Sequence, residues 1–164
     1  MIICGCGYTG LKIAAVYQKR ADTLRILQNG LSLLETEIRY ASTPLPQALQ
    51  RVGEKLNRES RVIFTRAADI MQLREGCAVS EAWDAGIKTL SEAVWISAEE
   101  TSILALFGKG LGNSAKEDQL KNIALAKEQL HMAEKSAAAA REKNKRMWQY
   151  MGFCFGTVIV LLLV

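Results

Sequence analysis

The chain has 164 residues and a formal net charge of +4, which allows one compact domain but is too mild a charge to indicate nucleic-acid binding. Its four cysteines form no paired framework, and with a single histidine they complete no metal site. With only two prolines and no Ser/Pro-rich linker, the composition argues against a disordered chain, a disulfide-stapled secreted domain and a zinc module. It predicts neither a cofactor nor a metal.

The first segment, residues 1–17, is predicted to be a partial N-terminal transmembrane segment. Lys12 is its only charge, and Lys19 and Arg20 follow as a basic flank of the kind found on the cytoplasmic side. Only eleven residues precede Lys12, fewer than the roughly 20 that a full helical span requires. The sequence therefore indicates either a lysine that reaches back to the interface or a start that lacks part of the span.

Within this segment, the run from Gly5 to Gly10 also matches the G-x-G-x-x-G pattern of dinucleotide-binding folds. That fingerprint requires a preceding strand, further βαβ units and an acidic residue about 20 positions on. Residues 22–40 instead show a helical pattern, so the dinucleotide-dependent enzyme is the weaker alternative. The glycines suit close packing against a second membrane helix better.

The middle of the chain, residues 18–146, is predicted to form a cytosolic helical domain. It contains no alternating β-branched run long enough for a strand. Over residues 22–40, apolar side chains recur every three or four positions, which is typical of one face of an amphipathic helix. That face consists of Leu24, Leu27, Leu31, Leu34 and Ile38. The sequence therefore predicts an all-α fold, a bundle of about six helices joined by short loops.

Capping and breaking residues divide the next segment into two shorter helices. Thr43 is expected to cap a helix whose first turn holds Pro44, where a missing N–H is harmless, and which runs to about Asn57. Ser60 is expected to cap the following helix, and Gly76 is expected to end it.

Three further helices complete the predicted bundle. Ser80 is expected to open the first of them, whose apolar positions are spaced by three or four and form a seam against other helices. Those positions are Val79, Trp83, Ile87, Leu90 and Val94. Ser97 with Glu100, and Ser114 with Glu117, match the capping box that opens a helix. The helix from Ser114 has no breaker, so we expect it to be the longest and to continue into the C-terminal membrane segment.

The last eighteen residues, 147–164, carry no charge and are predicted to be a C-terminal transmembrane helix. Their number matches the roughly 17–25 residues that cross the hydrocarbon core. Trp148 and Tyr150 stand at the entrance, where amphipathic rings prefer the headgroup layer. Lys145 and Arg146 end a basic flank that belongs on the cytoplasmic side. These four are the predicted membrane-interface residues, and they place the bundle in the cytoplasm.

A group of basic residues around the second predicted helix is the clearest candidate for binding a partner. It consists of Arg39, Arg51, Lys55, Arg58 and Arg61. Such a group suits an acidic partner or a lipid surface, although basic side chains also serve plain solubility. The single histidine, His131, has no converging nucleophile or second acid–base group, so no catalytic residue is predicted. The chain is not expected to be an enzyme.

Several segments resemble motifs of a known family. The first resembles the PL-x-x-AL helix opening of the inner-membrane platform (F) proteins of type II secretion and type IV pili. The second is similar to their Gly-then-LSEAL signature, with Trp83 where that family usually has leucine. In order and spacing, over essentially the whole chain, the segments resemble the stage III sporulation protein AB family. The matching residues are Pro44, Leu45, Ala48, Leu49, Gly76, Ser80, Glu81, Ala82, Gly108, Leu111, Gly112 and Gln119.

The resemblance implies a non-enzymatic platform component of a channel complex between mother cell and forespore. Its helical domain would face the mother-cell cytoplasm from the outer forespore membrane, and its partners would be a secretion-type ATPase and other membrane components. Members of the family usually begin with a complete membrane helix, which residues 1–17 hold only in part. The alternative class is a membrane-anchored sensor domain, which would need the bundle outside the cell, against the basic flanks.

Overall fold

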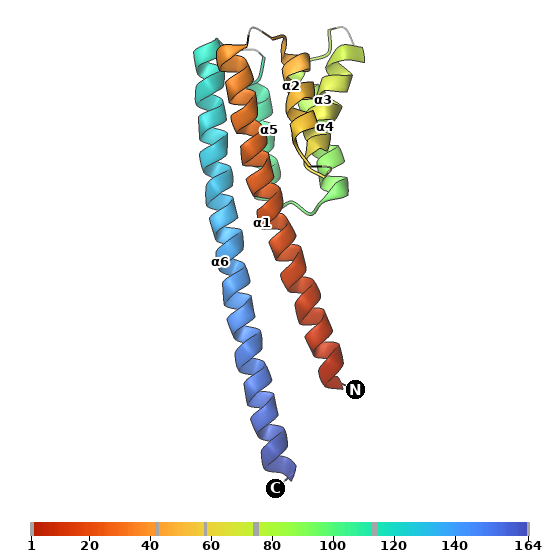
Figure 1. Ribbon diagram of the computed structural model, residues 1–164, viewed down its shortest axis with the longest axis vertical. Coiled ribbons are helices and arrows are strands. Elements are labelled where there is room, and N and C mark those ends of the chain that lie inside the picture. The colour runs from red at the N-terminus through yellow and green to blue at the C-terminus, as the bar shows by residue number, and fades with distance from the viewer. Residues whose placement is uncertain (1, 42, 58, 74–75, 113–114, 164) are drawn as a thin grey trace.

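Six α-helices make up the computed structural model (Figure 1). They are α1 (Ile2–Tyr40), α2 (Leu45–Lys55), α3 (Arg61–Leu73), α4 (Val79–Ala93), α5 (Ala98–Gly110) and α6 (Lys116–Leu163). The structure describes the backbone of residues 2–41, 43–57, 59–73, 76–112 and 115–163, and the side chains of these ranges between 19 and 139. No strand occurs in these ranges, so the prediction of an all-α bundle of about six helices is confirmed.

Helices α1 and α6 lie side by side and continue well beyond the four shorter helices, both at the same end (Figure 1). We call this end of the bundle the tail end; the α2–α3 and α4–α5 connections lie there. The opposite end, which we call the head end, holds the α1–α2, α3–α4 and α5–α6 connections (Figure 1). The chain therefore runs up and down the bundle, and both of its terminal helices leave from the tail end.

A regular apolar seam joins α1 to α6. The leucine stripe predicted for residues 22–40 is buried, with Ile38 partly buried at its end. It packs within one core with an equally spaced stripe on α6, in which small side chains allow close approach. The α6 stripe consists of Ile123, Ala126, Leu130, Ala133 and Ala137. The helix predicted from residue 22 in fact begins at Ile2, because no proline precedes Pro44 to interrupt it.

Carboxylates on both helices are held by cations across this seam. Glu35 of α1 accepts hydrogen bonds from Lys127 at 3.0 Å and from Arg39 at 2.7 Å. The Lys127 bond most strongly lowers the pKa of Glu35, burial opposes it, and the Arg39 bond adds to the lowering. Burial acts to raise the pKa of Glu134, but hydrogen bonds from Gln28 and Arg25 outweigh it and leave that pKa lowered.

Acidification is expected to weaken the α1–α6 pair. Both carboxyls have a pKa below the ordinary 4.5 in the folded chain. Each therefore adds stability that is present above that value and is lost as the pH falls through the folded-state pKa. Urea unfolding at about pH 7 and about pH 3 measures this loss, and the double variant Glu35→Gln/Glu134→Gln should show a flatter pH dependence. Glu128→Gln, on the exposed face of α6, is the control; an equal slope in all three proteins would contradict the prediction.

Aromatic rings from three of the short helices, α3, α4 and α5, pack together. Trp83 of α4 is fully buried and meets Phe64 of α3 and Phe107 of α5 edge to face, at centroid distances of 5.5 and 5.2 Å. Its indole Nε1–H donates to the backbone carbonyl of Leu104 at 2.9 Å. Gly108 lies directly against the indole, where a Cβ atom would collide with the ring. This cluster connects three helices and forms the centre of the domain.

Some of the predicted helix caps differ from the structure. Pro44, not Thr43, occupies the cap position of α2, because its extended backbone (φ −55°, ψ 142°) lets its carbonyl accept from the Ala48 N–H at 3.0 Å. Helix α2 ends at Lys55, two residues before the predicted Asn57. Helix α4 begins at Val79, one residue before the predicted Ser80, with Ala78 as the cap residue.

The capping box of Ser97 and Glu100 is confirmed with both of its hydrogen bonds. Ser114, the first residue of the other predicted box, lies outside the described residues, and α6 begins at Lys116. As predicted, α6 continues without a break, to Leu163. The run from Gly5 to Gly10 is helical within α1, so it does not form the strand and turn that a dinucleotide site requires.

The predicted membrane segments, residues 1–17 and 147–164, lie outside the residues whose side chains the structure describes. The interface residues Trp148, Tyr150, Lys145 and Arg146 belong to the same undescribed part. Among the described residues, no helix combines the length and the apolar character needed to cross a bilayer.

Candidate interaction site at the head end

The head end of the bundle gathers residues that lie far apart in the sequence. The α1–α2 connection brings Pro44 and Leu45 there, the α3–α4 connection brings Gly76, and the α5–α6 connection brings Leu111 and Gly112 (Figure 1). The sequence motifs around these residues were recognised separately, and the up-and-down path of the chain places all of them at one end. This end is therefore the best candidate for a functional surface of the described domain.

Direct contacts hold the three connections together. Gly112 lies against the side chain of Val79, which joins the α5–α6 connection to the start of α4. Lys116 Nζ donates to the backbone carbonyl of Arg39 at 2.8 Å, which joins the start of α6 to the end of α1. The head end is thus one packed surface, in which a displacement of one connection strains its neighbours.

The motif residues divide between packing and exposure. Ala48, Leu49, Ala82 and Leu111 are buried, and Gly108 is covered by Trp83, so these positions serve the core. The exposed or partly exposed members are Pro44, Leu45, Gly76, Ser80, Glu81, Gly112 and Gln119. The second group is the part of the motifs that a partner can reach.

Gly76 and Gly112 both adopt the left-handed backbone conformation, with φ of 83° and 82°. A Cβ atom at Gly76 would meet nothing within 4 Å, whereas one at Gly112 would press into Val79. A substitution at Gly76 therefore shows the cost of the backbone conformation alone, and one at Gly112 shows that cost together with the cost of the contact.

Gly112→Ala is expected to destabilise the domain more than Gly76→Ala. The left-handed conformation alone costs an alanine about 1–2 kcal/mol at either position, and only Gly112→Ala adds the collision with Val79. Thermal unfolding of both variants measures the difference. Equal losses of stability would show that Val79 moves aside freely and that the connections are not tightly packed.

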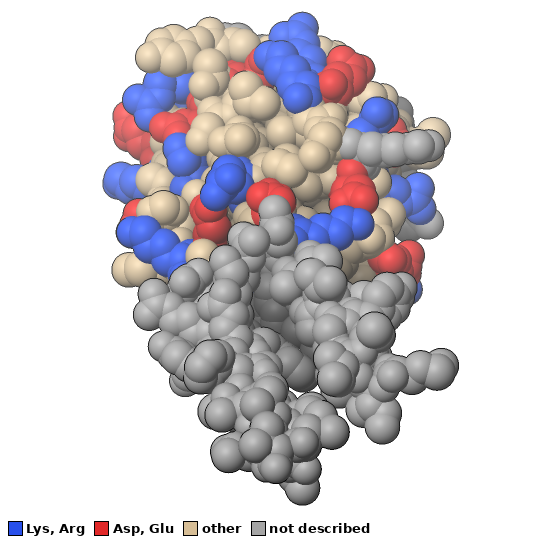
Figure 2. Space-filling model, turned by 60° about the horizontal axis from the view of Figure 1, so that its bottom comes forward, with Lys and Arg blue, Asp and Glu red and all other residues tan. Residues whose placement is uncertain are grey.

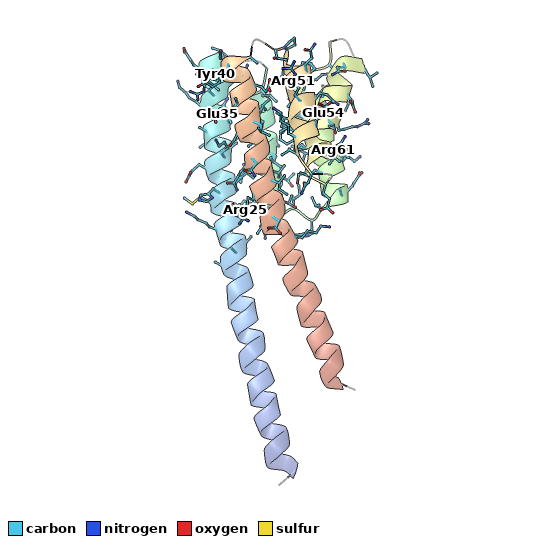
Figure 3. All side chains as sticks on the ribbon, in the orientation of Figure 1. Arg25, Glu35, Tyr40, Arg51, Glu54 and Arg61 are labelled. Carbon is cyan, nitrogen blue, oxygen red and sulfur yellow. The ribbon has the colours of Figure 1, made fainter. Side chains whose placement is uncertain are left out.

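Two large apolar side chains at the head end are almost fully exposed. Tyr40 at the end of α1 and Leu73 at the end of α3 are each 81% exposed (Tyr40 is labelled in Figure 3). Sequence reasoning missed both as candidates. Leu73 belongs to a periodic apolar pattern and therefore reads as a core residue, and only the position at which α3 ends places it in solvent. Exposed apolar residues of this size are typical of protein–protein contacts.

The predicted basic group is brought together only in part. Arg51 and Lys55 approach Glu37, with N–O distances of 3.5 and 3.7 Å, and Arg39 pairs with Glu35. Arg61 lies toward the tail end, at the start of α3 (Figure 3), and Arg58 lies outside the described residues. Figure 2 shows lysines and arginines interspersed with acidic residues on the face it presents, without a large area of one sign. Ion pairs within the domain thus account for much of this charge.

The remaining polar candidates form no reactive site among the described side chains. His131 lies on α6 with Nδ1 3.7 Å from a carboxylate oxygen of Glu134. No group of three or more possible metal ligands occurs in the described part of the chain.

Comparison with known proteins identifies the family. A family model described as stage III sporulation protein AB matches residues 1–164. The chain belongs to this family. It is 32% identical over 164 residues to the stage III sporulation protein AB of Bacillus subtilis (strain 168), with 99% of this chain and 95% of that protein covered.

A solved structure of stage III sporulation protein AB (SpoIIIAB) is also similar to this chain. The TM-score is 0.71 at 28% identity, and the match covers 76% of this chain and 98% of the solved chain. The helical domain described above is therefore the fold of the family. Membership assigns the chain to sporulation, as the sequence resemblance predicted.

Proposed function

We propose that this chain is a membrane-anchored, non-enzymatic platform of a sporulation channel complex between mother cell and forespore, which couples a secretion-type ATPase to membrane-embedded parts. The observation that carries the proposal is the departure of α1 and α6 from the same end of the bundle (Figure 1). The outer sequences of these two helices, residues 1–17 and 147–164, hold a single charge, Lys12. Two apolar helix ends that extend from the same end of the bundle can enter the same membrane.

This arrangement gives the domain a defined orientation. Lys19 and Arg20 lie where α1 enters the bundle, and Lys145 and Arg146 follow the bundle on α6. Basic residues beside membrane helices remain on the cytoplasmic side, so in this proposal the bundle lies in the mother-cell cytoplasm at the outer forespore membrane. The head end then points away from the membrane, toward cytosolic partners.

The ATPase is proposed to dock on the head end. Tyr40 and Leu73 supply exposed apolar contact area there, and the contacts between the three connections make the surface continuous. A push on this surface would pass along the antiparallel α1–α6 pair, whose buried seam and ion pairs join the two helices. For such coupling, the ATPase must bind two arrangements of the domain with different affinity.

Co-purification from sporulating cells tests the proposal. The full-length wild type is expected to retain the ATPase and other membrane components after gentle solubilisation. Tyr40→Asp and Leu73→Asp should each reduce recovery of the ATPase by about tenfold or more, as expected for central contact residues. Circular dichroism and thermal unfolding should match the wild type, because both side chains are exposed.

Met132→Asp is the matched control, because Met132 is an exposed apolar residue in the middle of α6, away from the head end. It should recover the ATPase like the wild type. A wild type that purifies alone while the rest of the complex stays intact would overturn the platform role. Loss of the ATPase with Met132→Asp, and retention with both head-end variants, would place the contact elsewhere.

A further inference from the structure

The connection between α4 and α5 presents a tryptophan at the tail end of the bundle. Trp95 is 57% exposed, whereas Val94 before it is buried and Ile96 after it is partly buried. Trp95 is thus the apolar side chain of this connection that faces outward. A tryptophan that keeps so much surface in water needs a reason, because its burial would be strongly favourable.

Contacts with α1 fix the position of Trp95 along the long axis of the bundle. The Arg20 guanidinium lies over the indole, with Cζ 5.0 Å from the ring centroid. Arg20 is itself held by Glu100 at 2.7 Å and by Ser97 at 3.2 Å. Trp95 therefore lies level with Arg20, three residues along α1 from Tyr17, the last residue of the apolar segment 1–17. At the helical rise of about 1.5 Å per residue, this separation is roughly 4–5 Å.

We propose that Trp95 inserts into the lipid headgroup layer and holds the tail end of the bundle against the membrane surface. This inference rests on the proposed anchoring of the domain by α1 and α6. The polar interfacial region adds several ångströms on each side of the hydrocarbon core, so an indole about 4–5 Å from the apolar segment lies within this region. Indole rings prefer this layer because it accommodates both an apolar face and an N–H donor.

The charges around Trp95 show which kind of lipid contact is involved. Lys19 is paired with Glu59 at 2.9 Å, and Glu92 and Glu99 are exposed near Trp95 in the sequence. Acidic and basic side chains are mixed over this side of the molecule (Figure 2). Attraction to anionic headgroups is therefore not the source of binding. The contact depends on the indole and is expected to persist in zwitterionic bilayers at high salt.

Tryptophan fluorescence in lipid vesicles tests this inference with the full-length protein. The chain has three tryptophans, and Trp83 is fully buried, so it serves as an internal reference. Phosphatidylcholine brominated near the headgroup should quench Trp148→Phe, in which Trp95 remains, more than deeply brominated lipid does. Of the two indoles that this variant retains, only that of Trp95 is accessible to lipid, so quenching should remove at most about half of the emission. Trp95→Phe/Trp148→Phe should lose none.

The variant Trp95→Phe separates this inference from the anchoring on which it rests, because it retains Trp148. Quenching of Trp148 without quenching of Trp95 would overturn the headgroup contact and leave the anchor intact. Absence of quenching at both positions would overturn the anchor and the contact together. Quenching of Trp95 only in anionic vesicles at low salt would overturn the indole-based contact.

Discussion

Replacement of Trp83 by alanine is expected to lower the free energy of unfolding by about 3–5 kcal/mol, the usual range for removal of a large buried aromatic side chain. The indole is fully buried between Phe64 and Phe107, so the substitution leaves a cavity where three helices meet. Gly108 has no side chain with which to fill it. Much of the stability of α3, α4 and α5 would be lost together, and in a domain of this size such a loss approaches complete unfolding.

Trp83→Phe is the control for this prediction. This variant keeps an aromatic ring in the cluster and removes the hydrogen bond to the Leu104 carbonyl. Its free energy of unfolding should therefore fall by only about 1–2 kcal/mol, the cost of one hydrogen bond and a smaller cavity. Urea unfolding in mild detergent, followed by circular dichroism, measures both variants. A loss for Trp83→Ala no larger than that for Trp83→Phe would show that the cavity collapses and that the cluster is not the centre of the fold.

Glu100→Ala is expected to be about as damaging, with a loss of about 3–5 kcal/mol, because it breaks a buried ion pair from one side. The Glu100 side chain is fully buried and that of Arg20 is 13% exposed. Without Glu100, the guanidinium would remain almost buried with no counter-charge, and the Ser97 N–H would lose its acceptor at 2.6 Å. The part of α1 around Arg20 should then separate from the start of α5. Proteases should cleave near the α4–α5 connection faster than in the wild type.

Two comparisons show whether the charge or the position matters. Glu99→Ala alters the adjacent, exposed carboxylate in the same helical turn and should unfold close to the wild type. The double variant Arg20→Met/Glu100→Leu removes both charges and fills the space with apolar groups, so it should recover much of the loss seen with Glu100→Ala. A double variant as unstable as Glu100→Ala would indicate that the loss comes from the helix cap and not from an unpaired charge.

Local patterns were sufficient to predict most of the helices. The leucine spacing on α1 and the seam on α4 identified buried faces correctly. A periodic apolar stripe must be buried in the core, whichever neighbouring helix packs against it. The cap prediction failed at Thr43, which stands one position before Pro44, whose backbone meets the same need. Such shifts depend on the packing of the first turn, which composition does not reveal.

The two ends of the bundle could not be predicted in the same way. Glu100 was identified from the sequence as half of a capping box, but its ion pair with Arg20 joins residues 80 positions apart. The gathering of three motifs at the head end likewise follows from the direction of each helix. Tyr40 and Leu73 become candidate contact residues only once those directions are known. Long-range pairing, and not helix propensity, was the missing information.

The length of α1 within the bundle has an electrostatic consequence. Twenty residues separate Arg20 from Tyr40 on one continuous helix, which places the head end about 30 Å from the tail end. The Debye length at physiological ionic strength is about 8 Å. With the bilayer at the tail end, as proposed, the surface potential of the lipids is screened out before it reaches the head end. Recognition there then depends on the partner alone, and changes in lipid charge would not alter the affinity of the head end for that partner.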